Sequence, residues 1–235
     1  ALLLLPVLAA PAWAQDAKPA PTPAPGPATR AFQPPAGCEA YLTVQMASCT
    51  VSHHFRCEAD PEGWQRRVDM DEEGIAYAGA IDAETQWVES NHFVSEHAEA
   101  LGAASDPASF TELTATGRDG FDFVTESPEI GQTRYVGEDR LTGATETIDG
   151  VTLDVTEFQI VASTPDGTEV WRGTGSEYIS RDWRMFLSGR SAITSDGQTT
   201  QSDSQPVEFI FPGERGFLSV SPKHGCGAVM SKALR

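Results

Sequence analysis

Turn signals recur along this chain at the short intervals that separate β-strands. Asp-Gly dipeptides begin at residues 149, 166 and 196, between segments in which apolar and polar residues alternate. Such dipeptides favour the two-residue turns of β-hairpins, because Gly and Asp tolerate the positive φ values that these turns require. Further turns are expected at residues 60–63, 71–74 and 82–83. The chain is therefore expected to fold mainly as consecutive antiparallel strands.

The alternating segments locate the strands. They are expected at residues 49–57, 63–70, 74–81 and 85–90, and later at 170–180, 183–189 and 207–211. Between Val151 and Ala162 the apolar residues change from odd to even positions, which predicts a β-bulge near Thr156 or Glu157. Because bulges bend sheets, we expect a mainly β fold with a strongly curved antiparallel sheet or an incomplete barrel.

Two short helices are expected between these groups of strands. The first covers residues 92–101. The second runs from an N-cap at residue 105 or 106 to Gly117, with Phe110 and Leu113 toward the core. Together they are expected to cover one face of the sheet.

The N-terminus has the features of an export signal. Residues 1–10 form an apolar run, and Ala12-Trp13-Ala14 matches a small-residue cleavage site, so residues 1–14 are interpreted as a signal peptide. The seven prolines between residues 19 and 35 predict an extended linker over residues 15–36. A single β-rich domain is expected over residues 37–235. The protein is then periplasmic or secreted, with no transmembrane segment after cleavage.

Four cysteines in an exported chain predict two disulfides. If residues 49–57 form one strand, its ends lie about 26 Å apart at roughly 3.3 Å per residue, so Cys49 and Cys57 cannot bond each other. Cys226 must then pair with one of the three N-terminal cysteines. Of the pairings that remain, we favour Cys38 with Cys49 and Cys57 with Cys226.

A Cys/His metal site is the alternative use of these cysteines. His53 and His54 lie near Cys57, and His224 lies near Cys226. Their spacing matches no zinc motif, and adjacent residues of a strand point to opposite faces, so disulfides are favoured. A second histidine pair, at residues 92 and 97, is five residues apart and is expected to face solvent. The sequence thus predicts no metal site and no cofactor.

The strong acidity of the chain limits its partners. The formal net charge is -18, which repels phosphates and excludes nucleic acid as an expected partner. Residues 69–74 resemble the first half of a calcium-binding EF-hand loop, but Ala80 stands where the last carboxylate ligand is required. An acidic hairpin turn is the better interpretation.

Catalytic motifs are missing from the sequence. There is no G-x-S-x-G elbow, phosphate-binding P-loop, dinucleotide-binding glycine motif or H-E-x-x-H. A hydrolase that uses scattered acidic residues leaves no such motif, so enzymatic activity stays an open alternative. The missing motifs favour a binding protein, and a scaffold for other envelope proteins is a third possibility.

Aromatic residues are concentrated in the later strands. If the sheet curls into an incomplete barrel, its concave face needs covering, and the two short helices are expected to form a lid. A lipid-like small molecule is then the expected ligand. The residues expected to line its site are Trp87, Trp171, Trp183, Phe186, Phe209 and Phe211.

This expected architecture resembles the periplasmic lipoprotein-carrier (LolA/LolB-like) family. Its members have a signal peptide, a domain of similar size, an unclosed antiparallel barrel and helices over the barrel mouth. The resemblance covers residues 49–220 and implies a carrier for an apolar or amphipathic ligand. The disulfides and the proline-rich linker depart from the family pattern.

Overall fold

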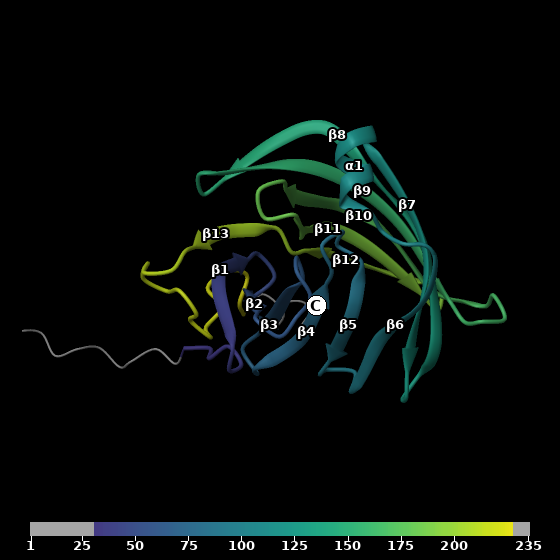
Figure 1. Ribbon diagram of the computed structural model, residues 1–235, viewed down its shortest axis with the longest axis horizontal. Coiled ribbons are helices and arrows are strands. Elements are labelled where there is room, and N and C mark those ends of the chain that lie inside the picture. Colours follow the sequence, from purple (N-terminus) through teal and green to yellow (C-terminus); the bar gives the residue numbers. More distant parts are fainter. Residues whose placement is uncertain (1–30, 228–235) are drawn as a thin grey trace, which may run out of the picture.

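The computed structural model describes residues 31–227, and most of them belong to one antiparallel sheet (Figure 1). Its strands are β1 (Cys38–Met46), β2 (Thr50–Cys57), β3 (Gln65–Met70), β4 (Ile75–Ile81), β5 (Trp87–His92), β6 (His97–Asp106), β7 (Arg118–Ser127), β8 (Gly131–Ile148), β9 (Val151–Ser163), β10 (Glu169–Ser180), β11 (Met185–Ser195), β12 (Gln198–Asp203) and β13 (Pro206–Ile210). A helix, α1 (Phe110–Thr116), follows β6. The expected signal peptide and residues 15–30 of the expected linker lie outside the described residues.

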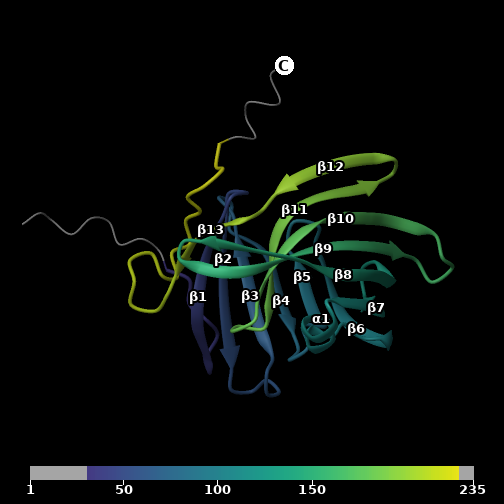
Figure 2. The same ribbon diagram turned by 90° about the horizontal axis from the view of Figure 1, so that it is seen from above.

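Strand order in the sheet follows chain order almost throughout. Each strand from β2 to β12 pairs with the strand before it, and β13 returns to pair with β1. The edges are β12 and β13, so the sheet formed by the described residues is not closed into a barrel. In Figure 2, β1 to β4 run at a steep angle to β9 and β10, as expected when strand twist accumulates. The prediction of a mainly β fold on a curved antiparallel sheet is confirmed.

The helix predicted over residues 92–101 is wrong. These residues form the turn between β5 and β6 and the first half of β6, with His92 and His97 as cross-strand partners. Glu99 is buried between the less buried Ala98 and the exposed Ala100, as expected when successive side chains of a strand point to opposite faces. Within residues 31–227 the structure therefore has one helix instead of the two expected.

The second predicted helix exists but is shorter than expected. Ser109 is its N-cap, and the Ser109 hydroxyl accepts a hydrogen bond from the Glu112 amide. Gly117 ends the helix with a φ of 86°, a left-handed conformation that glycine adopts without strain. Phe110 and Leu113 are buried, as predicted.

The predicted bulge at Thr156 or Glu157 lies instead on the neighbouring strand. The β8–β9 register jumps from Leu141 opposite Thr156 to Thr145 opposite Asp154, so the additional residues belong to β8. The tip of this hairpin lies beside β13, where the Phe209 amide donates a hydrogen bond of 2.9 Å to the Asp149 carboxylate. The phase change in the sequence thus signalled a real irregularity in the sheet but not the strand that carries it.

Both expected disulfides form, but the favoured pairing is wrong. Cys38 bonds Cys57, and Cys49 bonds Cys226. Cys38 and Cys57 are register partners of β1 and β2, a pairing that was missed because residues 38–46 were not expected to form a strand. Cys49 lies in the β1–β2 turn, where its amide donates to the His224 carbonyl of the C-terminal segment. The predictions that Cys49 and Cys57 do not bond each other and that Cys226 reaches back are confirmed.

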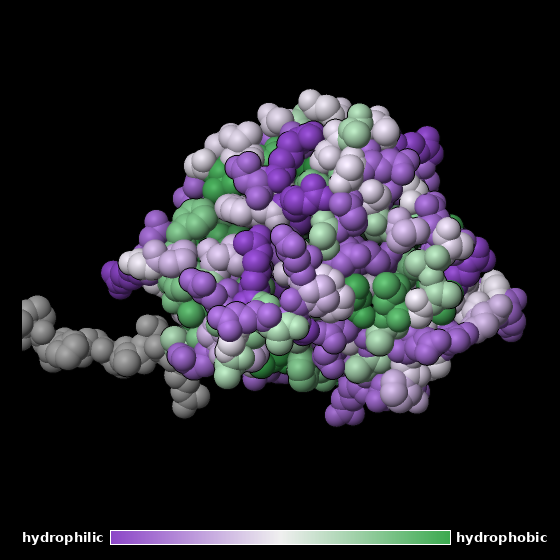
Figure 3. All heavy atoms as spheres, in the orientation of Figure 1, coloured by the Kyte–Doolittle hydropathy of each residue, from purple (hydrophilic) through white to green (hydrophobic). Residues whose placement is uncertain are grey.

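The surface view in Figure 3 shows mostly hydrophilic residues, with hydrophobic residues in small patches. The helix α1, in the described part of the chain, is not long and apolar enough to cross a membrane.

Removal of the Cys49–Cys226 disulfide is expected to destabilise the protein more than removal of Cys38–Cys57. The first closes a loop of 177 residues and the second a loop of 19. In the chain-entropy model, loops of these lengths correspond to about 5 and about 3 kcal/mol of stability. Urea unfolding of the two double Cys→Ser variants measures the difference. Equal midpoints for the two variants, or peptide mapping that shows another pairing, would contradict this account.

Candidate functional site

A cavity of about 820 Å³ lies on the concave side of the sheet. Its lining comes from strands β2 to β11 and from the segments next to α1. Because side chains alternate across a strand, every second residue of these strands faces inward. The sheet therefore brings distant parts of the sequence to one space of the size that holds a small-molecule ligand.

Aromatic side chains form one wall of this cavity. Trp87 meets Phe123 and Tyr135 edge-on, with ring centroids 5.7 and 5.5 Å apart. Tyr135 also contacts Trp171 at 6.0 Å. We refer to the set Trp87, Phe121, Phe123, Tyr135, Phe158 and Trp171 as the aromatic wall. Trp87 remains 44% exposed, so much of its surface is open to a ligand.

Glycines in β10 make room for the aromatic wall. A Cβ at Gly173 would lie 2.7 Å from the Ile193 side chain, and one at Gly175 would lie 2.2 Å from the Arg190 carbonyl oxygen and 2.8 Å from the Phe158 ring. Any other residue would displace a neighbouring strand or the ring.

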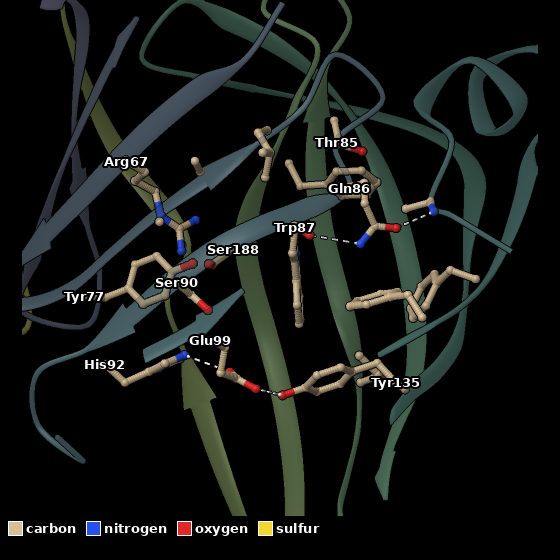
Figure 4. Close-up of a pocket in the computed structure, with 18 of the residues that line it drawn as sticks. Arg67, Tyr77, Thr85, Gln86, Trp87, Ser90, His92, Glu99, Tyr135 and Ser188 are labelled. Atoms are coloured by element: carbon tan, nitrogen blue, oxygen red, sulfur yellow. Dashed lines mark hydrogen bonds and ion pairs between the residues drawn. The ribbon is translucent and has the colours of Figure 1, made fainter. Parts of the chain in front are cut away.

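A second group of lining residues is polar, and we refer to Arg67, Asp69, Tyr77, Ser90, Glu177 and Ser188 as the polar patch. The Arg67 guanidinium lies over the Tyr77 ring, 4.8 Å from its centroid. In Figure 4, Arg67, Tyr77, Ser90 and Ser188 lie on one side of Trp87, and Tyr135 lies on the other. The cavity is therefore amphipathic.

Two polar atoms in this region have no hydrogen-bond partner among the described residues. They are Nε2 of His54 and Nε of Arg67. Arg67 Nε is 3.3 Å from an Asp69 oxygen, which is close enough for an ion pair, but the two do not form a hydrogen bond. Burial lowers the pKa of His54 to about 3, so its ring is neutral. Buried polar atoms of proteins are seldom left without a partner, so a ligand or water is expected here.

Two carboxyl groups of the cavity hold their protons near neutral pH. Burial, together with the negative charges of Glu177, Asp119 and Glu138, raises the pKa of Asp139 to about 8. Burial raises the pKa of Glu177 to about 7, although the positive charge of Arg67 opposes the shift. Both groups lie in the cavity lining.

Contacts between α1, the segment before it and two turns lie beside the cavity. The Glu84 carboxylate accepts hydrogen bonds from the amide and hydroxyl of Thr111, and it pairs with Arg184 at 2.7 Å. Gln86 accepts a hydrogen bond from the Ala108 amide at 2.9 Å. Thr85, Gln86 and Ala108 line the cavity, but no residue of α1 does, so the expected lid of two helices is not found in the described residues.

A cluster of two histidines and a glutamate lies elsewhere in the lining. His92 and His97 were expected to face solvent, but both line the cavity, and the His97 side chain is only 16% exposed. Their rings stack with centroids 4.4 Å apart. Burial of Glu99 would raise its pKa, but hydrogen bonds from His92, Thr125 and Tyr135 outweigh this effect and lower the pKa to about 2. Glu99 is therefore ionised.

The six aromatic residues predicted to bind a ligand divide into two groups. Trp87, Trp171 and Phe186 line the cavity. Trp183 instead packs against Phe209 and Phe211, with ring centroids 5.7 and 6.0 Å away. Phe209 lies in β13, which pairs with β1, and Phe211 follows that strand directly. Both therefore reach the hydrophobic cluster around Leu42 of β1, where Trp183 of the β10–β11 turn packs against them.

Sequence reasoning missed the polar half of the cavity. Arg67, Tyr77 and Glu99 have no motif around them. The signal that was available is their alternation: residues 65, 67 and 69 share one face of β3, and 97 and 99 share one face of β6.

Comparisons of the chain with protein-family models, curated proteins and solved structures find no match. The resemblance to the lipoprotein carriers therefore stays a prediction, and the site has to be interpreted from its own geometry.

Because the Asp139 and Glu177 carboxyls are protonated in the folded protein, the free energy of unfolding is expected to fall as pH rises. In the unfolded chain both groups have a pKa near 4, so between about pH 4 and pH 8 the folded protein holds protons that the unfolded chain releases. Their stabilising contribution is complete below about pH 4 and is lost as pH rises through about 7 to 8. The melting temperature should fall between pH 5 and pH 9, and the fall should be smaller in the double variant Asp139→Asn/Glu177→Gln.

Glu62→Gln, at an exposed turn position, is the matched control and should keep the slope of the wild type. An unchanged slope in the double variant would show that the buried carboxyls are not the source of the pH dependence.

Proposed function

We propose that this protein is an exported binding or carrier protein for an amphipathic, lipid-like molecule. The observation that carries the proposal is the cavity of about 820 Å³, which has the aromatic wall and the polar patch in one continuous lining. Ligand pockets of this volume are mostly apolar, with a few polar groups that fix the orientation of the ligand.

The aromatic wall supports binding of an apolar tail. Burial of a methylene group contributes about 0.8 kcal/mol, so a tail of about twelve carbons contributes on the order of 10 kcal/mol before the costs of association. Micromolar binding corresponds to about 8 kcal/mol. Trp87, which is 44% exposed, is the residue of the wall that a tail would cover most.

The polar patch supports binding of a head group. The Arg67 side chain lines the cavity and is 35% exposed. A carboxylate or phosphate head would accept hydrogen bonds from this guanidinium. The protonated Glu177 would donate a further hydrogen bond to the same head group below about pH 7.

The two disulfides support an extracytoplasmic location, because such bonds persist in oxidising compartments. We place the carrier in the periplasm. There it would move an amphipathic molecule through water.

A hydrolase is the second candidate function. The observation in its favour is that Asp139 and Glu177, with pKa values of about 8 and about 7, lie in one cavity and can exchange protons at neutral pH. Ester and glycoside substrates test this function. Product release by the wild type that is lost in the Asp139→Asn variant would favour a hydrolase over simple binding.

Titration of a fluorescent fatty-acid analogue into delipidated protein tests the carrier function. Saturable micromolar binding is expected, and Trp87→Ala should weaken it about tenfold because a large contact surface of the tail is lost. Phe93→Ala is the matched control: Phe93 is an exposed aromatic residue in the β5–β6 turn, outside the cavity, and its removal should leave binding unchanged.

The head-group contact is tested with two probes that share the same tail. Arg67→Gln should weaken binding of the carboxylate probe and leave binding of the matching fatty alcohol unchanged. The proposal fails if the wild type binds neither probe, or if Trp87→Ala and Phe93→Ala weaken binding equally.

A further inference from the structure

The β5–β6 hairpin places three metal-ligating side chains on one face of the sheet. His92 and His97 are directly opposite each other in the register of the two strands. Glu99 is two residues beyond His97, so its side chain points to the same face. All three residues line the cavity, and His92 and Glu99 are drawn together in Figure 4.

The distances within this trio are close to those of a metal site. Oε2 of Glu99 lies 3.4 Å from Nε2 of His92 and 3.9 Å from Nε2 of His97. One ligand atom of each residue lies within 4.8 Å of the others. A tetrahedral zinc ion with bonds of about 2.0–2.1 Å holds its ligand atoms roughly 3.3 Å apart. Because the two rings are stacked nearly parallel, His92, the more exposed of the two, has to rotate out of the stack before both nitrogens can point at one ion.

Neighbouring residues orient these ligands. Thr125 and Tyr135 donate hydrogen bonds of 2.6 and 3.0 Å to Oε1 of Glu99, which leaves Oε2 for the histidines. The Ser95 hydroxyl lies 3.0 Å from Nδ1 of His97, so Nε2 of that ring is directed to Glu99. Metal-binding histidines and carboxylates are held by outer hydrogen bonds of this kind.

We propose that His92, His97 and Glu99 bind one divalent zinc-class metal ion at the wall of the cavity. Two imidazoles and one carboxylate are a donor set that zinc accepts, and three protein ligands leave a fourth position for water or for a group of a bound molecule. That position is open to the cavity. The other metal-compatible group in the described residues, Cys49, Cys226 and Glu72, contains two cysteines that are joined in a disulfide.

This ion would not be structural. The three ligands lie on one hairpin of a sheet that is held by strand pairing and two disulfides. Chelation with EDTA should therefore remove the metal without loss of the β-type circular dichroism, unlike a structural zinc whose removal unfolds a domain. The proposal does not require that the cavity binds a lipid, because zinc binding is measured with zinc alone.

Calorimetric titration of chelator-treated protein with Zn²⁺ tests the proposal. One ion per chain is expected with submicromolar affinity, and His97→Ala should weaken binding at least a hundredfold. Ser95→Ala, which removes only the outer hydrogen bond, should weaken it about tenfold. His224→Ala is the matched control, because His224 pairs with Glu208 outside the cavity and its loss should change nothing.

X-ray absorption of the zinc-loaded wild type gives a result that does not depend on any variant. It should show two histidine nitrogens and additional oxygen ligands at about 2.0–2.1 Å. Wild-type affinity weaker than about 100 µM, equal binding by His97→Ala and the wild type, or a spectrum without histidine ligands would each overturn the proposal. Histidine and glutamate would then form only a hydrogen-bonded cluster.

Discussion

The unbroken antiparallel pairing of neighbouring strands is the constraint on which the rest of this structure depends. From β1 to β12 each strand bonds to the next one in the chain, and β13 returns to β1. Twist accumulates over so many strands and curls the sheet, so one face becomes concave. Every second side chain then points into a shared space, which is how Arg67 of β3 and Glu177 of β10 come to face the same cavity. The disulfides hold the start of the sheet and join it to the C-terminal segment.

Few elements other than the sheet itself are available to cover its concave face. Within the described residues α1 is the one helix, and it contributes no side chain to the cavity lining, while the β8–β9 hairpin reaches β13. A cavity that existed only because the packing is poor would be lined by apolar side chains alone. This one contains two carboxyls that keep their protons near neutral pH and an ionised Glu99. Such groups are costly to bury, which is the physical reason to interpret the cavity as a binding site.

Local features of the sequence predicted much of the fold, and long-range pairing could not be predicted. The Asp-Gly turns and alternating segments located most of the strands, because both signals arise within a few residues. The return of β13 to β1 has no local signal, and it places Phe209 and Phe211 outside the cavity, where Trp183 packs against them. The same limit applies to Cys38, whose partner depends on a strand that was not recognised. His92 and His97 were misplaced because a helix was expected where a hairpin forms.

Native mass spectrometry of the protein isolated from its own compartment, without detergent or organic solvent, tests the central claim most directly. The account predicts a mass above that of the oxidised polypeptide by one amphipathic molecule per chain, and extraction with organic solvent should release a compound with an acyl or similar apolar tail. A bare polypeptide mass in every preparation, with no lipid in the extract, would contradict it.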